Sequence, residues 1–513
     1  MTNDKNKTEL LVHNSNEKQQ RIFDSTKLFM EMLVEWLIIM MLLLILSPLI
    51  LVIFIARSSE QLVYWWLYGA SRLDGADLPW TMLNPEQGQS TLIIGMLELN
   101  GELTLSECRQ LLGERLVNTG AFPRVCQYIT AGFVNHYWVD DPEFQIENHV
   151  LSHSSPIRSD EQMQDLIGSL FLRPFRGASP WECLVVPKLD NKNSDNLKTV
   201  LLFRLNHAIG DGSSLAYFLA SSLGDVHIDL PRPTGFQNLI VKSSTVMDTL
   251  KGLWYLPSVY VSVLTRPMDH NIFHTSCKLS LTKKVSWSDA ISLNKIKHVK
   301  NSLGTTVNDI FIGVLSKSVS DYCRSQGSST LSPITIINAV SLRREIPSGF
   351  DNQIAALTLP FVTSDEPLET TDHISKMKFV LDRMKRRKAA FGLIVGFRFI
   401  AFMLPWALLK WFMFDEINKT TGNVTNLVGP RETLTIEGRR VDMLTFWQPG
   451  VCNQGLGISF CTYGDEVRMA IQTDSYALPN DEKPEIILRI FEDNFNQLCN
   501  CLLYTSPSPR DRG

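Results

Sequence analysis

Residues 206 to 212 read Asn-His-Ala-Ile-Gly-Asp-Gly, and this stretch decides how the rest of the chain is interpreted. An apolar, strand-like run precedes it at residues 199–205, and a helix-like run follows it at residues 214–219. His207 is therefore expected on a loop at the end of a strand, where catalytic side chains are commonly placed. A neutral imidazole accepts a proton from a hydroxyl group near pH 7. The stretch therefore predicts a general base at His207.

The residues after His207 restrict the chemistry further. Gly210 and Gly212 bracket Asp211 and permit a tight backbone path, so we expect Asp211 to brace the loop rather than to react. His207 and Asp211 have the i, i+4 spacing of helical metal ligands, but the two glycines disfavour a helix and no third ligand is obvious. The chain also lacks the Gly-x-Ser-x-Gly elbow of serine hydrolases.

The same stretch resembles HHxxxDG, the signature of CoA-dependent acyltransferases and of peptide-synthetase condensation domains. The second histidine of that motif is the general base in the family, and it maps to His207. Asn206 replaces the first histidine, a position with a supporting role. Further segments occur in the family's order, and they make the chain similar to the wax ester synthase / acyl-CoA:diacylglycerol acyltransferase family: Pro180-Trp181-Glu182, Asn308-Asp309, Val340-Ser341-Leu342-Arg343, Asp351-Asn352 and residues 423–430.

The second half of the chain is expected to complete the site. Asn308 and Asp309 follow Thr306 at the start of a predicted helix, where a cap and a first-turn charge are the simplest interpretation. The resemblance instead implies that they support the catalytic centre. Arg343 ends a predicted strand and is a candidate partner for Asp211, because a buried carboxylate needs a donor.

The tetrahedral intermediate of acyl transfer needs a hydrogen-bond donor for its oxyanion. Asn308, Asn206 and a backbone N–H near Gly212 are the three candidates that the sequence offers.

Bulk composition sets outer limits on the function. The chain has 513 residues, so two packed domains of roughly 200 residues each are expected. A net charge of -4 and a pI near 6.2 argue against nucleic acid as a partner. Nine scattered cysteines lack the paired spacing of a zinc site and are typical of free thiols in a reducing compartment. No metal site is therefore expected.

Residues 36–56 are uncharged and almost wholly apolar. They follow a polar tail at residues 1–35, of which residues 1 to about 30 are expected to be disordered. At 1.5 Å per residue the apolar run reaches about 31 Å, the thickness of a hydrocarbon core. A transmembrane anchor is the main interpretation. Ser47-Pro48 leaves a re-entrant hairpin open, and a buried core helix is the third alternative.

Two segments near the end of the chain need separate interpretation. Residues 389–414 are apolar but contain Arg398, Pro405 and Lys410, which favours a helix in the membrane interface. A spanning helix and a buried helix are the alternatives. Residues 501–513 resemble translated sequencing-adapter sequence and are left out of the interpretation.

The resemblance implies an α/β fold with two acyltransferase-like domains, each a mixed sheet with flanking helices. We expect these domains at residues 85–265 and 280–500. The implied reaction moves a long-chain acyl group from acyl-CoA to a long-chain alcohol or diacylglycerol beside a lipid bilayer, with no cofactor. The implied location is the endoplasmic reticulum. The alternative is a catalytically inactive, membrane-anchored protein that binds acyl-CoA or lipid.

Overall fold

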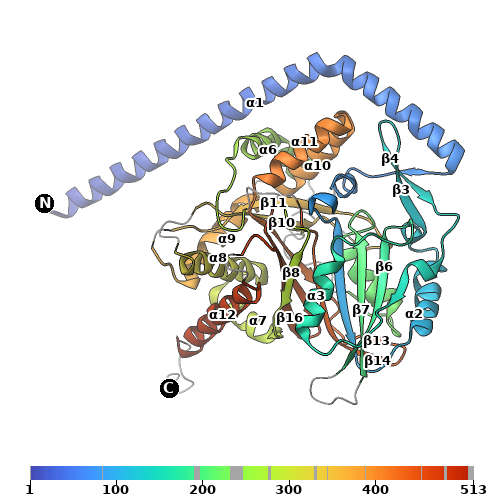
Figure 1. The fold of residues 1–513 in the computed structure, drawn as a ribbon. Helices are drawn as coiled ribbons and strands as arrows, with labels where there is room; N and C mark the ends of the chain where they lie inside the picture. Colours follow the sequence, from blue (N-terminus) through green and yellow to red (C-terminus); the bar gives the residue numbers. More distant parts are fainter. Residues whose placement is uncertain are drawn as a thin grey trace.

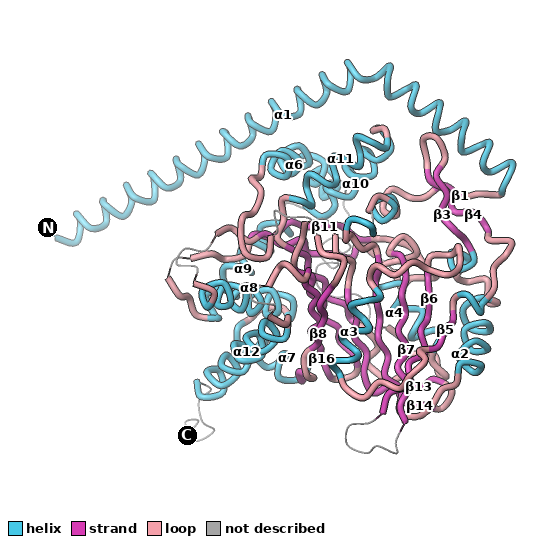
Figure 2. The backbone as a smooth tube through the Cα atoms, viewed as in Figure 1, coloured by secondary structure: helices cyan, strands magenta, loops and turns pink. Residues whose placement is uncertain are grey.

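Two large mixed sheets and one small sheet make up the strands of the computed structural model (Figure 1). The structure describes the chain except for residues 1, 84, 190–196, 231–245, 275–278, 328–331, 344, 365, 387–388, 452, 479–481 and 506–513. Strands occupy the centre and helices surround them. Three helices, α6 (Val246–Thr265), α10 (Ala389–Met403) and α11 (Trp406–Asn418), gather at the end over which α1 (Thr2–Tyr68) passes (Figure 2). This arrangement confirms the expected α/β fold of two mixed-sheet domains.

The sheet that carries residues 206–212 has six strands. Their order is β13 (Thr435–Ile436), β14 (Arg439–Trp447), β2 (Leu92–Leu99), β7 (Leu197–Asn206), β6 (Trp181–Leu189) and β5 (Val150–Ser152). β5 and β6 are parallel, and the other neighbours are antiparallel. Residues of β7 are buried on both faces, because helices or loops cover the two sides of this sheet.

The second large sheet has β11 (Ile354–Pro360), β10 (Thr335–Ser341), β12 (Gly422–Val428), β15 (Leu456–Tyr463), β16 (Glu466–Asp474) and β8 (Lys283–Trp287) in that order. β9 (Ile291–Ser292) also pairs with β16. β12 is parallel to both β10 and β15. A small sheet joins β1 (Ser71–Arg72), β4 (His136–Asp140) and β3 (Gln127–Ala131).

The helices bury their apolar faces against these sheets or against one another. α2 (Leu105–Leu112) packs in the core of the first sheet, and α3 (Asp160–Leu170) lies against β8 of the second. α4 (Gly212–Phe218) follows β7 directly. The remaining helices are α6 (Val246–Thr265), α7 (Leu293–Leu303), α8 (Val307–Ser325), α9 (Thr370–Arg386), α10 (Ala389–Met403), α11 (Trp406–Asn418) and α12 (Glu485–Thr505).

The expected boundary between the domains needs one correction. β13 and β14 lie within residues 280–500, yet β14 pairs with β2 of the first sheet from Val441–Leu99 to Trp447–Ile94. The second half of the chain therefore donates an edge to the first sheet. Sequence periodicity identifies a strand but not its partner, which long-range packing decides.

The N-terminal segment differs from the expected disordered tail. α1 runs from Thr2 to Tyr68, so residues 2–35 continue the helix of the apolar run. Lys, Glu and Gln are good helix formers, and a helix that is already nucleated extends at little cost. Residues Phe29–Tyr68 are long and apolar enough to cross a membrane by length and composition, and none of the most apolar window is buried. The buried-core alternative for residues 36–56 is therefore wrong.

The apolar segment at residues 389–414 forms two short helices. α10 ends at Met403 and α11 begins at Trp406, with Pro405 at the N-cap of α11. Proline lacks an amide donor, so the helix breaks there. Helices of this length are too short to span a bilayer, and the alternative of a second spanning helix is wrong.

At the C-terminus, α12 continues to Thr505, past residue 501, where the segment that resembles sequencing-adapter sequence begins. Residues 506–513 lie outside the described part of the chain.

Candidate active site at the end of strand β7

His207 follows directly after β7, as the sequence predicts. β7 lies between β2 and β6, and its last residue, Asn206, is paired with Leu92. The backbone N–H of His207 donates to the carbonyl of Thr91 at 2.9 Å. The position of the histidine is thus fixed by a central strand and not by a free loop.

The hydrogen bonds around the imidazole define its tautomer. Nδ1 of His207 lies 3.1 Å from Oδ1 of Asn352. The amide nitrogen of Asn352 donates to Oδ1 of Asp77 at 2.9 Å and to the carbonyl of His207 at 2.7 Å, which fixes the orientation of the amide. Its oxygen therefore faces Nδ1 and accepts the Nδ1 proton. This assignment leaves a lone pair on Nε2, the form that a general base requires.

The imidazole is buried and stays neutral. Only 8% of His207 is exposed, and its ring stacks on Trp80 with centroids 3.9 Å apart. Burial lowers the pKa of His207 to about 4, although the charge of Asp211 and hydrogen bonds act in the opposite direction. The unprotonated base is therefore the resting form at neutral pH. Trp80 therefore packs on the catalytic candidate.

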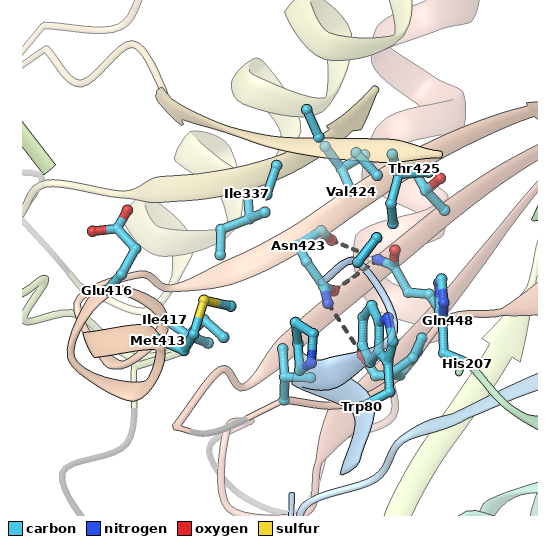
Figure 3. Close-up of a pocket in the computed structure, with 18 of the residues that line it drawn as sticks. Trp80, His207, Ile337, Met413, Glu416, Ile417, Asn423, Val424, Thr425 and Gln448 are labelled. Atoms are coloured by element: carbon cyan, nitrogen blue, oxygen red, sulfur yellow. Dashed lines mark hydrogen bonds between the residues drawn. The ribbon is translucent and has the colours of Figure 1, made fainter. Parts of the chain in front are cut away.

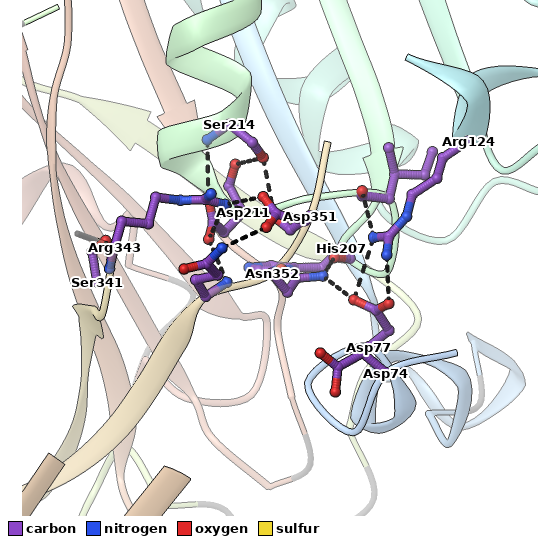
Figure 4. A network of polar contacts seen from close by, with 12 residues as sticks. Asp74, Asp77, Arg124, His207, Asp211, Ser214, Ser341, Arg343, Asp351 and Asn352 are labelled. Carbon is purple, nitrogen blue, oxygen red and sulfur yellow. Dashed lines mark hydrogen bonds and ion pairs between the residues drawn. The ribbon is translucent and has the colours of Figure 1, made fainter. Parts of the chain in front are cut away.

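The buried carboxylate of Asp77 helps to hold the loop that follows His207 (Figure 4). Oδ2 of Asp77 accepts from Nη2 of Arg124 at 2.8 Å. Nη1 of Arg124 donates to the carbonyls of Ala208 and Ile209 at 2.8 and 3.0 Å. Burial raises the pKa of Asp77, opposed by Arg124 and Asn352. Asp77 and Arg124 thus clamp the residues that follow His207.

Asp211 braces the loop, as predicted, and does so through both oxygens. Oδ1 accepts from the backbone N–H of Ser214 and caps α4 at 2.9 Å. Oδ2 accepts from Nη2 of Arg343 at 2.8 Å and from the backbone N–H of Gln353 at 2.9 Å. The predicted Asp211–Arg343 pair is therefore present. Both side chains are almost wholly buried. Because Asp211 lies in the first half of the chain and Arg343 in the second, the pair joins the two halves.

Asn206 holds the loop from its own side chain. Its Oδ1 accepts from the backbone N–H of Ala208 at 2.8 Å, and its Nδ2 donates to Oγ1 of Thr91 at 2.9 Å. An asparagine can thus support the loop at the position of the first motif histidine. Because both ends of the amide are engaged, Asn206 is a poor candidate for the oxyanion donor.

Gly210 is required by the close approach of α4 to the loop. A Cβ atom at this position would lie 2.5 Å from Oγ of Ser214, whereas Cβ of Phe350 would be at an ordinary contact distance of 3.4 Å. Any larger residue would push the loop away from the strand end that holds His207.

Asn308 and Asp309 do not join this cluster. Thr306 is the N-cap of α8, and Asp309 completes the capping box by accepting from the backbone N–H of Thr306 at 2.9 Å. No hydrogen bond or ion pair among the described residues connects Asn308 or Asp309 to His207. Asp309 acts as part of a helix cap, because an Asp three residues after Thr satisfies the free amides of a helix start, and support of the catalytic centre by this pair stays an expectation from the resemblance.

Two cavities meet beside the loop. The larger, of about 280 Å³, is lined by His207, Gly212 and apolar side chains from α6, α10, α11 and the second sheet. Figure 3 shows His207 and Trp80 at one end of its lining and Met413 and Glu416 at the other. The smaller, of about 60 Å³, lies among apolar residues of the first sheet and α4. Both cavities touch Ile93, Gly212, Leu427 and Phe446.

Comparison with known families decides the class of protein. The wax ester synthase/diacylglycerol acyltransferase catalytic domain matches residues 85–268, and the C-terminal domain of the same family matches residues 350–498. The chain belongs to this family. Its first match contains residues 206–212 and therefore the base candidate, and the chain carries an acyltransferase catalytic domain.

Relatives in the family span kingdoms at low identity. Wax ester synthase/diacylglycerol acyltransferase 11 of Arabidopsis thaliana is 23% identical over 68% of this chain and 77% of the relative. O-acyltransferase WSD of Acinetobacter baylyi is 22% identical over 67% of this chain and 79% of the relative.

Solved structures show the same fold. The wax ester synthase/diacylglycerol acyltransferase of Marinobacter aquaeolei matches with a TM-score of 0.56 at 15% identity, over 84% of this chain and 100% of that chain. A trichothecene 15-O-acetyltransferase of Fusarium sporotrichioides matches with a TM-score of 0.55 at 12% identity, over 84% of this chain and 95% of that chain.

Sequence reasoning missed several residues of the site. The sequence marks Asn352 only as part of a segment that resembles the family, and it does not link Asp77, Arg124 or Trp80 to His207. These residues come from separate segments that tertiary folding brings together, and no local spacing signals them. Within the described residues, no group of three or more His, Cys, Asp and Glu side chains is placed to hold a metal ion.

Proposed function

We propose that the protein transfers a long-chain acyl group from acyl-CoA to a lipid alcohol and forms a wax ester, a triacylglycerol or both. The observation that carries the proposal is the state of His207, which presents an unprotonated Nε2 to an apolar cavity while Asn352 holds Nδ1. Family membership supplies the reaction class, and the cavity supports lipid-like substrates.

The reaction follows from that geometry. Nε2 of His207 takes the proton of the acceptor hydroxyl as the oxygen attacks the thioester carbonyl. The carbon–sulfur bond then breaks, and the CoA thiolate receives the proton from Nε2. The products are one ester and free CoA, and the enzyme regains its starting state without a covalent intermediate or a cofactor.

The oxyanion of the tetrahedral intermediate is assigned to backbone amides. Asn206 is engaged elsewhere and Asn308 lies in α8, so the N–H groups near Gly212 remain from the three candidates. Gly212 and Ser213 open α4 and line the larger cavity, and first-turn amides have no partner within their own helix. A negative charge that develops beside them would be stabilised.

The relatives are named for wax ester synthesis and for acylation of diacylglycerol, which supports a long-chain alcohol or diacylglycerol as the acceptor proposed for this chain. The helix α1, with its exposed apolar surface, supports a protein held at a lipid bilayer, where both acceptors reside. We place it at the endoplasmic reticulum, on the logic that acyl-CoA and these acceptors meet there.

The test is acyl transfer by membranes that contain the full chain. Labelled palmitoyl-CoA is offered with hexadecanol or with diacylglycerol, and the products are separated from a parallel reaction of His207→Ala. Ester formed by the parent and not by the variant supports the proposal, and the preferred acceptor names the activity. A folded parent that binds palmitoyl-CoA but forms no ester with either acceptor would favour the lipid-binding alternative.

A further inference from the structure

α1 contacts the body of the protein near both ends of its apolar run. At the first end, Phe29 stacks on Trp254 of α6 with centroids 5.4 Å apart, and Nε1 of Trp36 donates to the carbonyl of Trp254 at 3.1 Å. At the second end, Phe54 packs on Phe402 of α10 with centroids 5.7 Å apart. Two ends of one helix therefore touch the same face of the body.

The contacts of the second end are polar as well as apolar. Arg57 is buried and donates to the carbonyls of Ala401 and Phe402 at 2.6 Å and of Leu404 at 2.9 Å, which satisfies the C-terminal end of α10. The carboxylate of Glu60 accepts from Nδ2 of Asn135 at 2.9 Å. Breaking these contacts would leave buried polar groups without hydrogen-bond partners, so the second end of α1 is firmly held.

Between these contacts, residues 37–52 form an arch that touches little of the protein. Figure 1 shows α1 bent as it passes over α6, α10 and α11, and Pro48 interrupts its hydrogen bonding. The arch exposes large apolar side chains, among them Leu37, Met40, Leu44, Ile45, Leu49 and Val52. Its sixteen residues reach about 24 Å even when straight, less than the roughly 30 Å of a hydrocarbon core.

The helices under the arch are apolar on both sides. Their outer faces expose Leu264 of α6, Phe399 of α10, and Leu408 and Trp411 of α11. Their inner faces supply Val263, Phe397 and Met413 to the larger cavity beside His207. One layer of helices therefore separates that cavity from the exposed apolar surface.

We propose that the arch and the outer faces of α6, α10 and α11 form one surface that enters the bilayer from a single side. In this arrangement α1 dips into the membrane and returns, and residue 29 and the catalytic body stay on the same side. The lipid acceptor then passes from the bilayer between α6, α10 and α11 to His207. This last step rests on the proposed function, whereas the topology does not.

The topology is tested with the full chain in sealed vesicles whose outer face carries the catalytic body. Epitopes are placed at the N-terminus and next to Tyr476, and protease is added outside. We expect both epitopes to be digested without detergent while the protein resists carbonate extraction. Protection of the N-terminal epitope alone would show a full span, and release by carbonate would show no insertion. Either result overturns the proposal.

Charge substitution tests the arch itself. Leu44→Lys places a cation at a side chain that is 74% exposed, and Leu281→Lys does the same at a remote side chain that is 64% exposed. We expect Leu44→Lys to release the protein into the carbonate extract and Leu281→Lys to leave it in the membrane, because a charge in hydrocarbon is costly. Equal retention of both variants would contradict insertion of the arch.

The path of the acceptor is tested by comparing a bilayer acceptor with a soluble one. Trp411→Glu should lower the ratio of the diacylglycerol rate to the butanol rate by at least about tenfold, since a carboxylate disfavours contact with lipid. Tyr476→Glu is the control at an exposed aromatic residue outside these helices, and its ratio should match the parent. An unchanged ratio for Trp411→Glu would overturn this path. A parent inactive with both acceptors would instead contradict the proposed function.

Discussion

At the scale of single residues, the proposed base is already positioned before any substrate arrives. Asn352 determines which nitrogen of His207 carries the proton, and Trp80 excludes water from one face of the ring. Burial keeps the imidazole neutral. Proton acceptance therefore needs no rearrangement of the histidine, because the surrounding fold already holds the ring in place.

The acid limb of the activity profile should lie well below the usual histidine range. Because the pKa of His207 is lowered to about 4, kcat/KM should stay on its plateau through pH 6 and fall only as the pH approaches 4. The measurement is kcat/KM for butanol between pH 4 and 8, in protein shown to remain folded. A half-point near pH 6.5 would mean that the base is an exposed imidazole or another group.

The same shift has a consequence for stability, and its sign follows from linkage. The unfolded chain, with a histidine pKa of about 6.5, binds the proton more readily than the folded protein. Folding should therefore lose stability as the pH falls from about 6.5 toward 4. His207→Gln should show a weaker loss than the parent in denaturant titrations over this range.

Asn352 should act as a positioning residue. Asn352→Ala removes the acceptor of the Nδ1 proton and the donor to Asp77, so the rate should fall by about 10²-fold or more. Gln353→Ala is the matched control, because the backbone N–H of Gln353, not its side chain, bonds to Asp211. Comparable kcat values for both variants would show that Asn352 does not position the base.

The sequence predicts the base and its brace but not the groups that orient them. His207 and Asp211 lie within one short stretch, where strand, turn and helix signals agree. Asn352 and Asp77 approach His207 from positions more than a hundred residues away, and only the folded chain brings them together. A buried histidine predicts that partners exist without identifying them.

At the scale of elements, one ion pair joins the start of α4 to the end of β10. Asp211 caps α4 while its other oxygen receives Arg343, which also pairs with Asp351 at 2.6 Å. The nearby charges raise the pKa of Arg343 against the effect of burial. The contact thus fixes the distance between the two halves at the point where His207 lies.

Arg343→Ala should destabilise the protein by about 3–5 kcal/mol, because Asp211 would remain buried without its cation. Arg440→Ala is the control, since Arg440 pairs with Asp442 at the surface and such pairs contribute about 0–1 kcal/mol. Denaturant unfolding of the detergent-solubilised protein gives both values. Equal stabilities of the two variants would mean that the pair does not hold the halves together.

Elements also show which local signals the sequence carries and which it does not. Thr306 and Asp309 form the capping box that their spacing predicts at the start of α8. For the segment at residues 389–414, the break at Pro405 is readable from the sequence. The packing of α6 and α10 over the cavity cannot be predicted from the sequence, because an apolar helix face does not specify which surface covers it.

At the scale of the whole molecule, the two halves of the sequence do not form separate structural units. β13 and β14 come from the second half of the sequence and complete the edge of the first sheet. Apolar residues of α3 and of the strand β16 share one core cluster. Domain boundaries drawn from sequence similarity therefore cut through a continuous structure.

Fragments split near residue 270 should not fold alone. Residues 85–268 would expose the edge of β2 that β14 normally covers, and an exposed strand edge promotes aggregation. The measurement is the solubility and circular dichroism of this fragment, alone and when expressed together with residues 269–505. A soluble, folded fragment on its own would contradict the shared sheet.

The role of His207 is tested most directly by the release of CoA from palmitoyl-CoA by the full chain and by His207→Ala, with butanol as the acceptor. Butanol removes any dependence on the membrane, and circular dichroism confirms that the two proteins are folded alike. We expect acceptor-dependent release by the parent and a loss of about 10²-fold or more in the variant. Equal release by both proteins would contradict the assignment of His207 as the base.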